Sequence, residues 1–172
     1  MIAIGVGTAV GLNALLSQKL GQKKHEEACR VATIGFFLMI ATSVVFSLSG
    51  VFFSKQIAMF LSKDIELQQL CNEYVSINLI FCYGIFLQTY GQRLLQAVGD
   101  TLLSMFSLII GAIVNIILDP IVIFGLFGCE AMGIRGAAIA TVIGQFVGAF
   151  AALVFNRIKL SLIHISEPTR RS

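Results

Sequence analysis

The sequence predicts an all-α membrane protein with five transmembrane helices. Charged residues make up 12% of the 172 residues, about half the share found in soluble domains. Hydrophobic residues make up 57%, and the mean hydropathy is +0.90. This composition excludes a soluble globular fold and a disordered chain. Five charge-free runs are each long enough to cross a bilayer core of about 30 Å as a helix: 1–18, 31–54, 74–92, 101–118 and 136–156.

Helices are expected rather than membrane strands, because a barrel strand shows about ten residues of strict alternation and these runs are continuous and longer. We place the five helices at residues 1–18, 31–54, 74–95, 101–124 and 133–156. Lys19 ends the first, and Arg30 and Lys55 bound the second. A turn at Gly99 separates the third from the fourth, with Asp100 as the N-cap of the fourth.

The basic residues predict the orientation of the chain. Alternate sides of the predicted bundle carry seven and three Lys or Arg residues, and the richer side includes the loop 19–30. The positive-inside rule places this loop in the cytoplasm, so the chain starts outside and ends inside. Residues 1–18 lack the basic n-region of a cleavable signal. An odd helix count with an outside start indicates a fragment, and we expect 160–172 to be a non-native tail.

Composition also bears on other classes of protein. The net charge of +3 forms no basic stripe, so no nucleic acid partner is expected. The cysteines are spaced too widely for a disulfide framework, and with two histidines they form no metal-binding pattern; they are Cys29, Cys71, Cys82 and Cys129. No cofactor is expected.

An intramembrane enzyme would show paired acids or a His cluster, whereas one acid stands at membrane depth. We therefore expect no enzyme.

The most informative cluster lies in the fourth predicted helix. Asn115 and Asp119 are four residues apart and so share one helix face. A charge at membrane depth costs about 2.5 to 3.5 kcal/mol, so Asp119 is expected to face a cavity or a partner. Pro120 removes a backbone donor and should kink the helix, leaving the carbonyl of Ile116 unpaired. Oxygen groups of this kind suit a proton or a hard cation such as Na⁺.

A structural alternative remains open for this cluster. Asp119 lies past the helix midpoint, on the outward half, so it could be a helix-end aspartate near the outer headgroups. In the last helix, the hydroxyl of Thr141 could bond to its own helix backbone or face a cavity. Glycines at Gly7 and Gly11, and at Gly144 and Gly148, form G-x-x-x-G pairs that predict close helix packing.

The third predicted helix carries several polar side chains. Gln88 lies near its inner end, and Asn78 and Tyr83 lie nearer its outer half. We interpret these three residues as candidate lining of a passage. Interfacial anchoring explains tyrosines such as Tyr83 about equally well.

Four motifs together resemble the MATE (multidrug and toxic compound extrusion) family, with the bacterial DinF or MepA-like branch as the best match. The motifs are GVGTAVGLNALLSQKLG at 5–21, RLLQAVGDT at 93–101, N-x-x-x-D-P at 115–120 and GIRGAAIAT at 133–141. The resemblance covers residues 1–159. It implies that the five helices match helices 2–6 of the N-terminal six-helix lobe of a twelve-helix transporter of the bacterial inner membrane.

The resemblance also implies a function and a site. Members of this family export cationic or amphipathic compounds, including xenobiotics, by antiport with Na⁺ or H⁺. Asn115, Asp119 and Thr141 match the family's first-lobe cation site. The family's first helix, which adds another acid to that site, and its C-terminal lobe have no counterpart in this chain. Alternating access needs both lobes, so the fragment alone is not expected to transport.

Two alternatives to efflux remain. One is a lipid-linked oligosaccharide flippase of the same superfamily, whose cavities tend to be more basic than these helices suggest. The other is a non-transporting scaffold subunit, since five apolar helices can simply pack against a partner in the bilayer.

Overall fold

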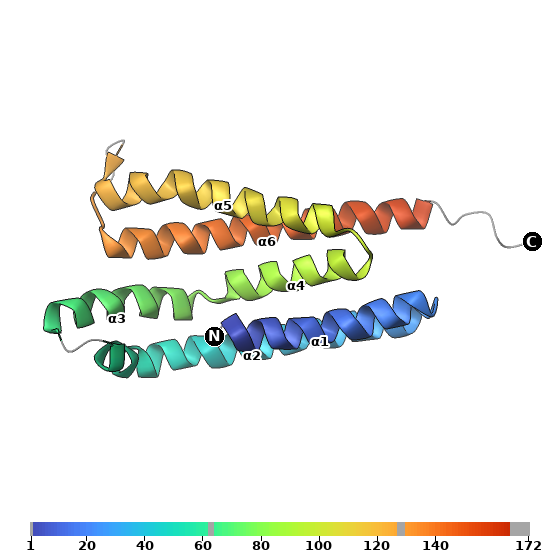
Figure 1. Ribbon diagram of the computed structural model, residues 1–172, viewed down its shortest axis with the longest axis horizontal. Coiled ribbons are helices and arrows are strands. Elements are labelled where there is room, and N and C mark those ends of the chain that lie inside the picture. Colours follow the sequence, from blue (N-terminus) through green and yellow to red (C-terminus); the bar gives the residue numbers. More distant parts are fainter. Residues whose placement is uncertain (1, 62–63, 127–129, 166–172) are drawn as a thin grey trace, which may run out of the picture.

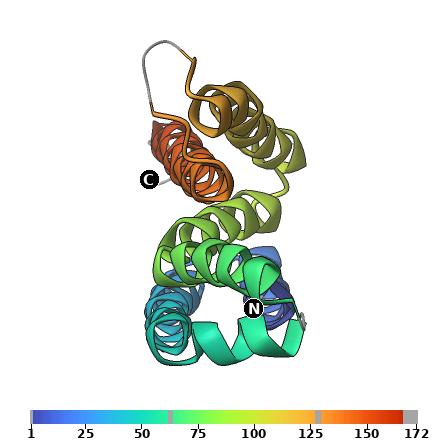
Figure 2. The ribbon, with the colours of Figure 1, turned by 90° about the vertical axis from the view of Figure 1, so that its left-hand side faces the viewer.

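The computed structural model describes residues 2–61, 64–126 and 130–165, which form six α-helices and no strand. The helices are α1 (Ile2–Gly21), α2 (His25–Leu61), α3 (Ile65–Ile80), α4 (Tyr83–Ala97), α5 (Thr101–Phe124) and α6 (Ile134–Ile165) (Figure 1). They lie in three tiers, with α1 beside α2, then α3 and α4, then α5 beside α6 (Figures 1 and 2). The predicted all-α class is confirmed.

Three of the described helices are long and apolar enough to cross a membrane: His25–Leu61, Thr101–Phe124 and Ile134–Lys159. The pair formed by α3 and α4 passes the same test when the two helices are taken together. In α2, large side chains such as Phe37 and Phe52 are exposed by more than 60%, as expected for a helix that faces lipid.

The helix bounds agree with the sequence prediction most closely for α5, which spans the predicted residues. Gly125 ends α5 in a left-handed conformation, with φ of 71°. Helices α1, α2 and α6 extend further than predicted, past the charged residues that bound each apolar run. In particular, α6 continues past 156 to Ile165 and so includes the start of the expected tail. Residues 166–172 lie outside the described residues.

The third predicted helix, 74–95, is corrected by the structure. Two helices, α3 and α4, occupy this region and meet at a bend of 49° around Phe81 and Cys82. Ser47 of α2 donates its hydroxyl hydrogen to the carbonyl of Ile80 at 3.0 Å. The Cys82 thiol donates to the carbonyl of Ser43 at 3.3 Å. The Ser47 bond gives a donor to a carbonyl at the break, and the Cys82 bond ties the start of α4 to α2.

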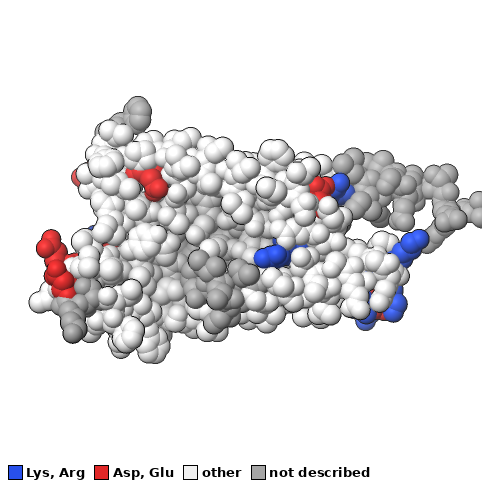
Figure 3. Space-filling model, viewed as in Figure 1, with Lys and Arg blue, Asp and Glu red and all other residues white. Residues whose placement is uncertain are grey.

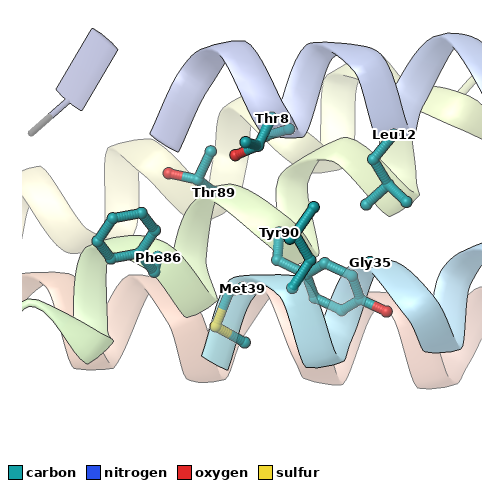
Figure 4. Close-up of a pocket in the computed structure, with 9 residues that line it drawn as sticks. Thr8, Leu12, Gly35, Met39, Phe86, Thr89 and Tyr90 are labelled. Carbon is teal, nitrogen blue, oxygen red and sulfur yellow. The ribbon is translucent and has the colours of Figure 1, made fainter. Parts of the chain in front are cut away.

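Helix α4 is the central element of the bundle, since it packs against α1, α2, α5 and α6. Phe86, Tyr90 and Leu95 on α4 are buried. The Tyr90 hydroxyl donates to the carbonyl of Ala32 on α2 at 2.9 Å. Tyr90 also borders a small cavity of about 20 Å³ between α1, α2 and α4, where Thr8 and Thr89 lie near one another (Figure 4). This volume suffices for about one water molecule.

Charged side chains gather at the two ends of the bundle. Figure 3 shows Lys and Arg mainly towards the end where α1 turns into α2, and Asp and Glu mainly towards the other. At the basic end, Lys159 of α6 pairs with Asp100 at 2.6 Å. Asp100 also caps α5, because its carboxylate accepts from the backbone N–H of Leu103 at 3.5 Å.

The Asp100 ion pair makes the bundle sensitive to acid. The Lys159 ammonium, followed by the cap bond from Leu103, holds the pKa of Asp100 below its ordinary 3.8. A carboxyl with a depressed pKa stabilises the folded state above its unfolded pKa, and this contribution is lost as the pH falls through the folded pKa. We expect melting followed by circular dichroism to show a larger loss between about pH 5 and about pH 3 for the wild type than for Asp100→Asn. Equal losses would contradict this assignment.

Candidate functional site

Helices α5 and α6 bring Asn115 and Thr141 together. The Asn115 Nδ2 lies 3.3 Å from the Thr141 hydroxyl, which itself donates to the carbonyl of Ala137 at 2.8 Å. Turning the Asn115 amide by 180° satisfies both of its ends. Its nitrogen then donates to Oδ2 of Asp119 at 3.2 Å, and its oxygen accepts from the backbone N–H of Thr141 at 3.1 Å. The amide therefore bridges Asp119 to α6.

Asp119 keeps one oxygen without a partner. Its Oδ1 is buried and has no hydrogen bond among the described residues. A buried carboxylate oxygen without a donor carries a substantial desolvation cost, which a bound proton or cation would relieve. Asp119 is half-buried as a whole residue, so it does not lie loose at the end of the helix.

Pro120 does not interrupt α5, which stays helical to Phe124. Because proline has no N–H, the carbonyl of Ile116 lacks its usual helical donor next to the Asp119 turn.

Glycines hold α5 against α6 at the site. A Cβ on Gly144 would lie 2.8 Å from the carbonyl oxygen of Gly111 and 3.1 Å from the Cβ of Asn115. A Cβ on Gly136 would lie 2.8 Å from the carbonyl oxygen of Val122. The predicted close packing on α6 is therefore confirmed. The prediction for α1 is wrong in this chain, since a Cβ on Gly7 or Gly11 would meet nothing within 4 Å.

A cavity of about 340 Å³ between α4, α5 and α6 adjoins Asn115 and Thr141. Its polar lining consists of amides and hydroxyls and includes no charged side chain: Gln88, Thr89, Gln92, Asn115, Thr141 and Gln145. Sequence reasoning placed Gln88 in such a passage but missed Gln145. Gln145 could have been predicted as a lining residue, because it follows Thr141 by one helical turn and shares its helix face.

The other two candidate lining residues lie elsewhere. Asn78 donates its amide to the carbonyl of Tyr74 on its own helix at 3.0 Å. Tyr83 begins α4 and is 37% exposed. Neither residue lines the cavity beside Asn115. One connected region is therefore formed by Asn115, Asp119, Thr141 and Gln88. Asn78 and Tyr83 lie outside this region.

No group of three metal-binding side chains converges anywhere in the described part of the chain. Cys29, Cys71 and Cys82 are free thiols. Cys129 lies outside the described residues. The groups around Asp119 are oxygens and amides, which suit a proton or a hard monovalent cation better than a transition metal.

Known proteins resemble this chain in sequence and in fold. A family model described as MatE matches residues 1–121. The chain is 28% identical over 159 residues to the probable multidrug resistance protein NorM of Thermotoga maritima. The matched region covers 91% of this chain and 34% of NorM. The chain is also 28% identical over 156 residues to the multidrug export protein MepA of Staphylococcus aureus, with coverage of 90% and 34%. The chain thus spans about a third of the length of these relatives.

Solved structures give the same result. An inward-facing multidrug resistance MATE family transporter of the MOP superfamily superposes with a TM-score of 0.83 at 25% identity, covering 90% of this chain and 34% of that chain. A MOP superfamily transporter from Pyrococcus furiosus, described as having a binding pocket of reverse polarity, gives a TM-score of 0.82 at 25% identity, with coverage of 92% and 34%.

These matches and the helical bundle define part of the N-terminal lobe of a multi-helix membrane transporter. The chain belongs to the MATE family. Members of this family are transporters rather than enzymes, and the homologues are multi-pass proteins of the bacterial inner membrane.

Proposed function

We propose that this chain is the N-lobe portion of a multidrug efflux transporter that exports cationic or amphipathic compounds by antiport with Na⁺ or H⁺. The single observation that carries the proposal is the buried, unpartnered Oδ1 of Asp119 beside Asn115 and Thr141. A coupled transporter needs a group that binds the coupling cation, and a carboxylate with one buried, unpartnered oxygen is such a group.

The coupling cation binds at Asp119 in this proposal. Asn115 orients the Asp119 carboxylate through Oδ2, which leaves Oδ1 for a proton or for Na⁺. The hydroxyl of Thr141 adds an oxygen on the facing helix. The family's first helix and C-terminal lobe complete the site and the alternating-access machinery.

The cavity beside this site would let a substrate bind next to the coupling cation. Neutral amides such as Gln88 and Gln92 line the cavity, so polar groups of a substrate find hydrogen bonds there without a competing fixed charge. This lining favours drug efflux over an oligosaccharide flippase, for which we expect basic side chains. A scaffold role gives no reason for a buried carboxylate oxygen without a hydrogen-bond partner, which costs free energy.

The charges at the ends of the bundle support the proposed orientation. The last turn of α1 carries Lys19, and the loop to α2 carries Lys23 and Lys24, so the positive-inside rule places this end in the cytoplasm. The Asp119 site then lies in the outer half of the bilayer, and the Asp100–Lys159 ion pair lies at the inner surface.

A chimera tests the proposed function. The matched residues of this chain replace the corresponding third of S. aureus MepA, and ethidium efflux is measured in cells and in proteoliposomes with imposed Na⁺ or pH gradients. We expect efflux that depends on one of the two gradients. A chimera that is inserted and folded, as judged by proteolysis and melting, but moves no ethidium under either gradient contradicts the proposal. Transfer of a labelled lipid-linked sugar instead of ethidium would favour the flippase.

A further inference from the structure

A second cavity lies at the basic end of the bundle, far along α6 from Thr141. It has a volume of about 250 Å³ and is formed by the ends of α1, α2, α4 and α6. Its walls are mainly aliphatic: Leu16, Leu20, Ala28, Ala32, Leu94, Leu95 and Val98. Several of these residues belong to a packed apolar cluster around Leu16 and Ala28. An aliphatic cavity of this kind excludes water and accepts an apolar occupant.

The polar group at the inner wall of this cavity is already satisfied. Asn156 is 8% exposed and donates its amide hydrogens to the carbonyls of Gly91 and Ala152, each at 2.8 Å. Its amide hydrogens are therefore not available to a ligand. The aliphatic walls and the absence of a free amide hydrogen on Asn156 favour part of a hydrocarbon chain over a polar molecule.

One ammonium and one imidazole side chain border the same cavity. His25 and Lys159 are among the residues that line it. Lys159 donates one ammonium hydrogen to Asp100, which leaves two hydrogens for another anion. His25 begins α2, where the positive end of the helix dipole also attracts anions.

The surface around this cavity also carries a net positive charge. Glu27, one of the nearby acids, is paired with both Lys19 and Lys24. Among the described residues, this end carries seven basic side chains against three acidic ones: Lys19, Lys23, Lys24, Arg30, Arg93, Arg157 and Lys159 against Glu26, Glu27 and Asp100. The net positive charge around the cavity complements an anionic lipid surface.

We propose that this cavity binds an anionic phospholipid, with one acyl chain among the aliphatic side chains and the lipid phosphate at Lys159 and His25. Basic pockets between the ends of transmembrane helices are suited to anionic lipid headgroups. The bound lipid would join α1, α2, α4 and α6 at the end of the bundle opposite Asp119. The site is separate from the proposed cation and substrate sites, so its test does not depend on transport.

Native mass spectrometry of the whole chain, released from nanodiscs with equal phosphatidylglycerol and phosphatidylcholine, measures the lipid retained. We expect phosphatidylglycerol to be retained in preference to phosphatidylcholine. Lys159→Ala is expected to lower this preference by about fivefold, the effect of one basic residue near a membrane surface. Lys55→Ala, at the other end of α2, removes the same charge and is expected to leave the preference unchanged.

Further arms separate the lipid site from a loss of folding. Asp100→Asn breaks the same ion pair but leaves the Lys159 ammonium, so retention is expected to persist or rise. Ala32→Phe fills the cavity and is expected to remove retention with Lys159 intact. Soluble glycerophosphoglycerol is expected not to displace the lipid, because it lacks the acyl chain. Equal retention of the two lipids, equal loss in Lys159→Ala and Asp100→Asn, or displacement by the soluble headgroup would overturn the proposal.

Discussion

Efflux by the chimera is expected to collapse when Asp119 is replaced with asparagine. The substitution keeps the size of the side chain and its hydrogen-bonding capacity towards Asn115, but it removes the charge that binds the cation. In one-for-one exchange of two monovalent cations no net charge crosses the membrane, so the imposed Na⁺ or proton gradient sets the ethidium gradient, at about 1.4 kcal/mol for each tenfold. Without the cation site, we expect the steady-state ethidium gradient to fall by about tenfold for each tenfold of imposed ion gradient. Ethidium fluorescence in proteoliposomes gives the measurement.

The matched control is Glu130→Gln, because Glu130 is an exposed acid in the segment that follows α5. This substitution removes the same charge outside the bundle and should leave efflux at the wild-type level. If Asp119→Asn and Glu130→Gln pump equally well, Asp119 has no part in coupling. Both variants must reach the membrane in wild-type amounts for the comparison.

Gly144→Ala is expected to separate α5 from α6 and to damage the Asp119 region indirectly. The new Cβ would lie 2.8 Å from the carbonyl oxygen of Gly111, a backbone atom that cannot move without shifting α5. Overpacking of this kind costs about 1 to 3 kcal/mol. We expect a lower midpoint of thermal unfolding in nanodiscs, measured by circular dichroism, because the helices themselves must move apart.

Gly11→Ala is the control for Gly144→Ala. A Cβ on Gly11 meets nothing within 4 Å, and alanine is a better helix former than glycine. The midpoint is expected to stay the same or to rise slightly. A Gly144→Ala variant as stable as Gly11→Ala would show that α5 and α6 do not depend on this close approach.

The membrane class and the long helices were predictable because the bilayer leaves the backbone few choices. Each charge-free run must satisfy its own N–H and C=O groups, which a helix does. The bounds of α5 were predictable as well, since Asp100 caps one end and Gly125 ends the other in a left-handed turn. These signals are local in sequence.

The break between α3 and α4 was not predictable from local signals. No proline or glycine stands at Phe81 or Cys82, and the surrounding run is free of charge. The bend is stabilised by Ser43 and Ser47 of α2, which are distant in sequence. Glu66 in the first turn of α3 and Glu73 in its middle also interrupt the apolar sequence, so the predicted helix began only at residue 74.

The candidate site was partly predictable. The spacing of Asn115 and Asp119 places both on one face of α5 without further information. The contact between Asn115 and Thr141 depends on how closely α6 approaches α5, which is set by Gly111 and Gly144. Sequence spacing alone does not pair these two helices, so Thr141 entered through the resemblance to a family. The polar cavity joins three helices, and part of its polar lining, including Gln145, appeared only in the folded chain.

Infrared difference spectroscopy on the chain with isotope-labelled aspartate tests the central claim most directly. The sequence has three aspartates, Asp64, Asp100 and Asp119, so single Asn variants assign each carboxylate band. We predict that Na⁺ or ethidium at constant pH produces a saturable change in the Asp119 band, that choline at equal ionic strength produces none, and that Asp119→Asn removes the change. An Asp119 band that responds to neither Na⁺ nor ethidium would contradict the account.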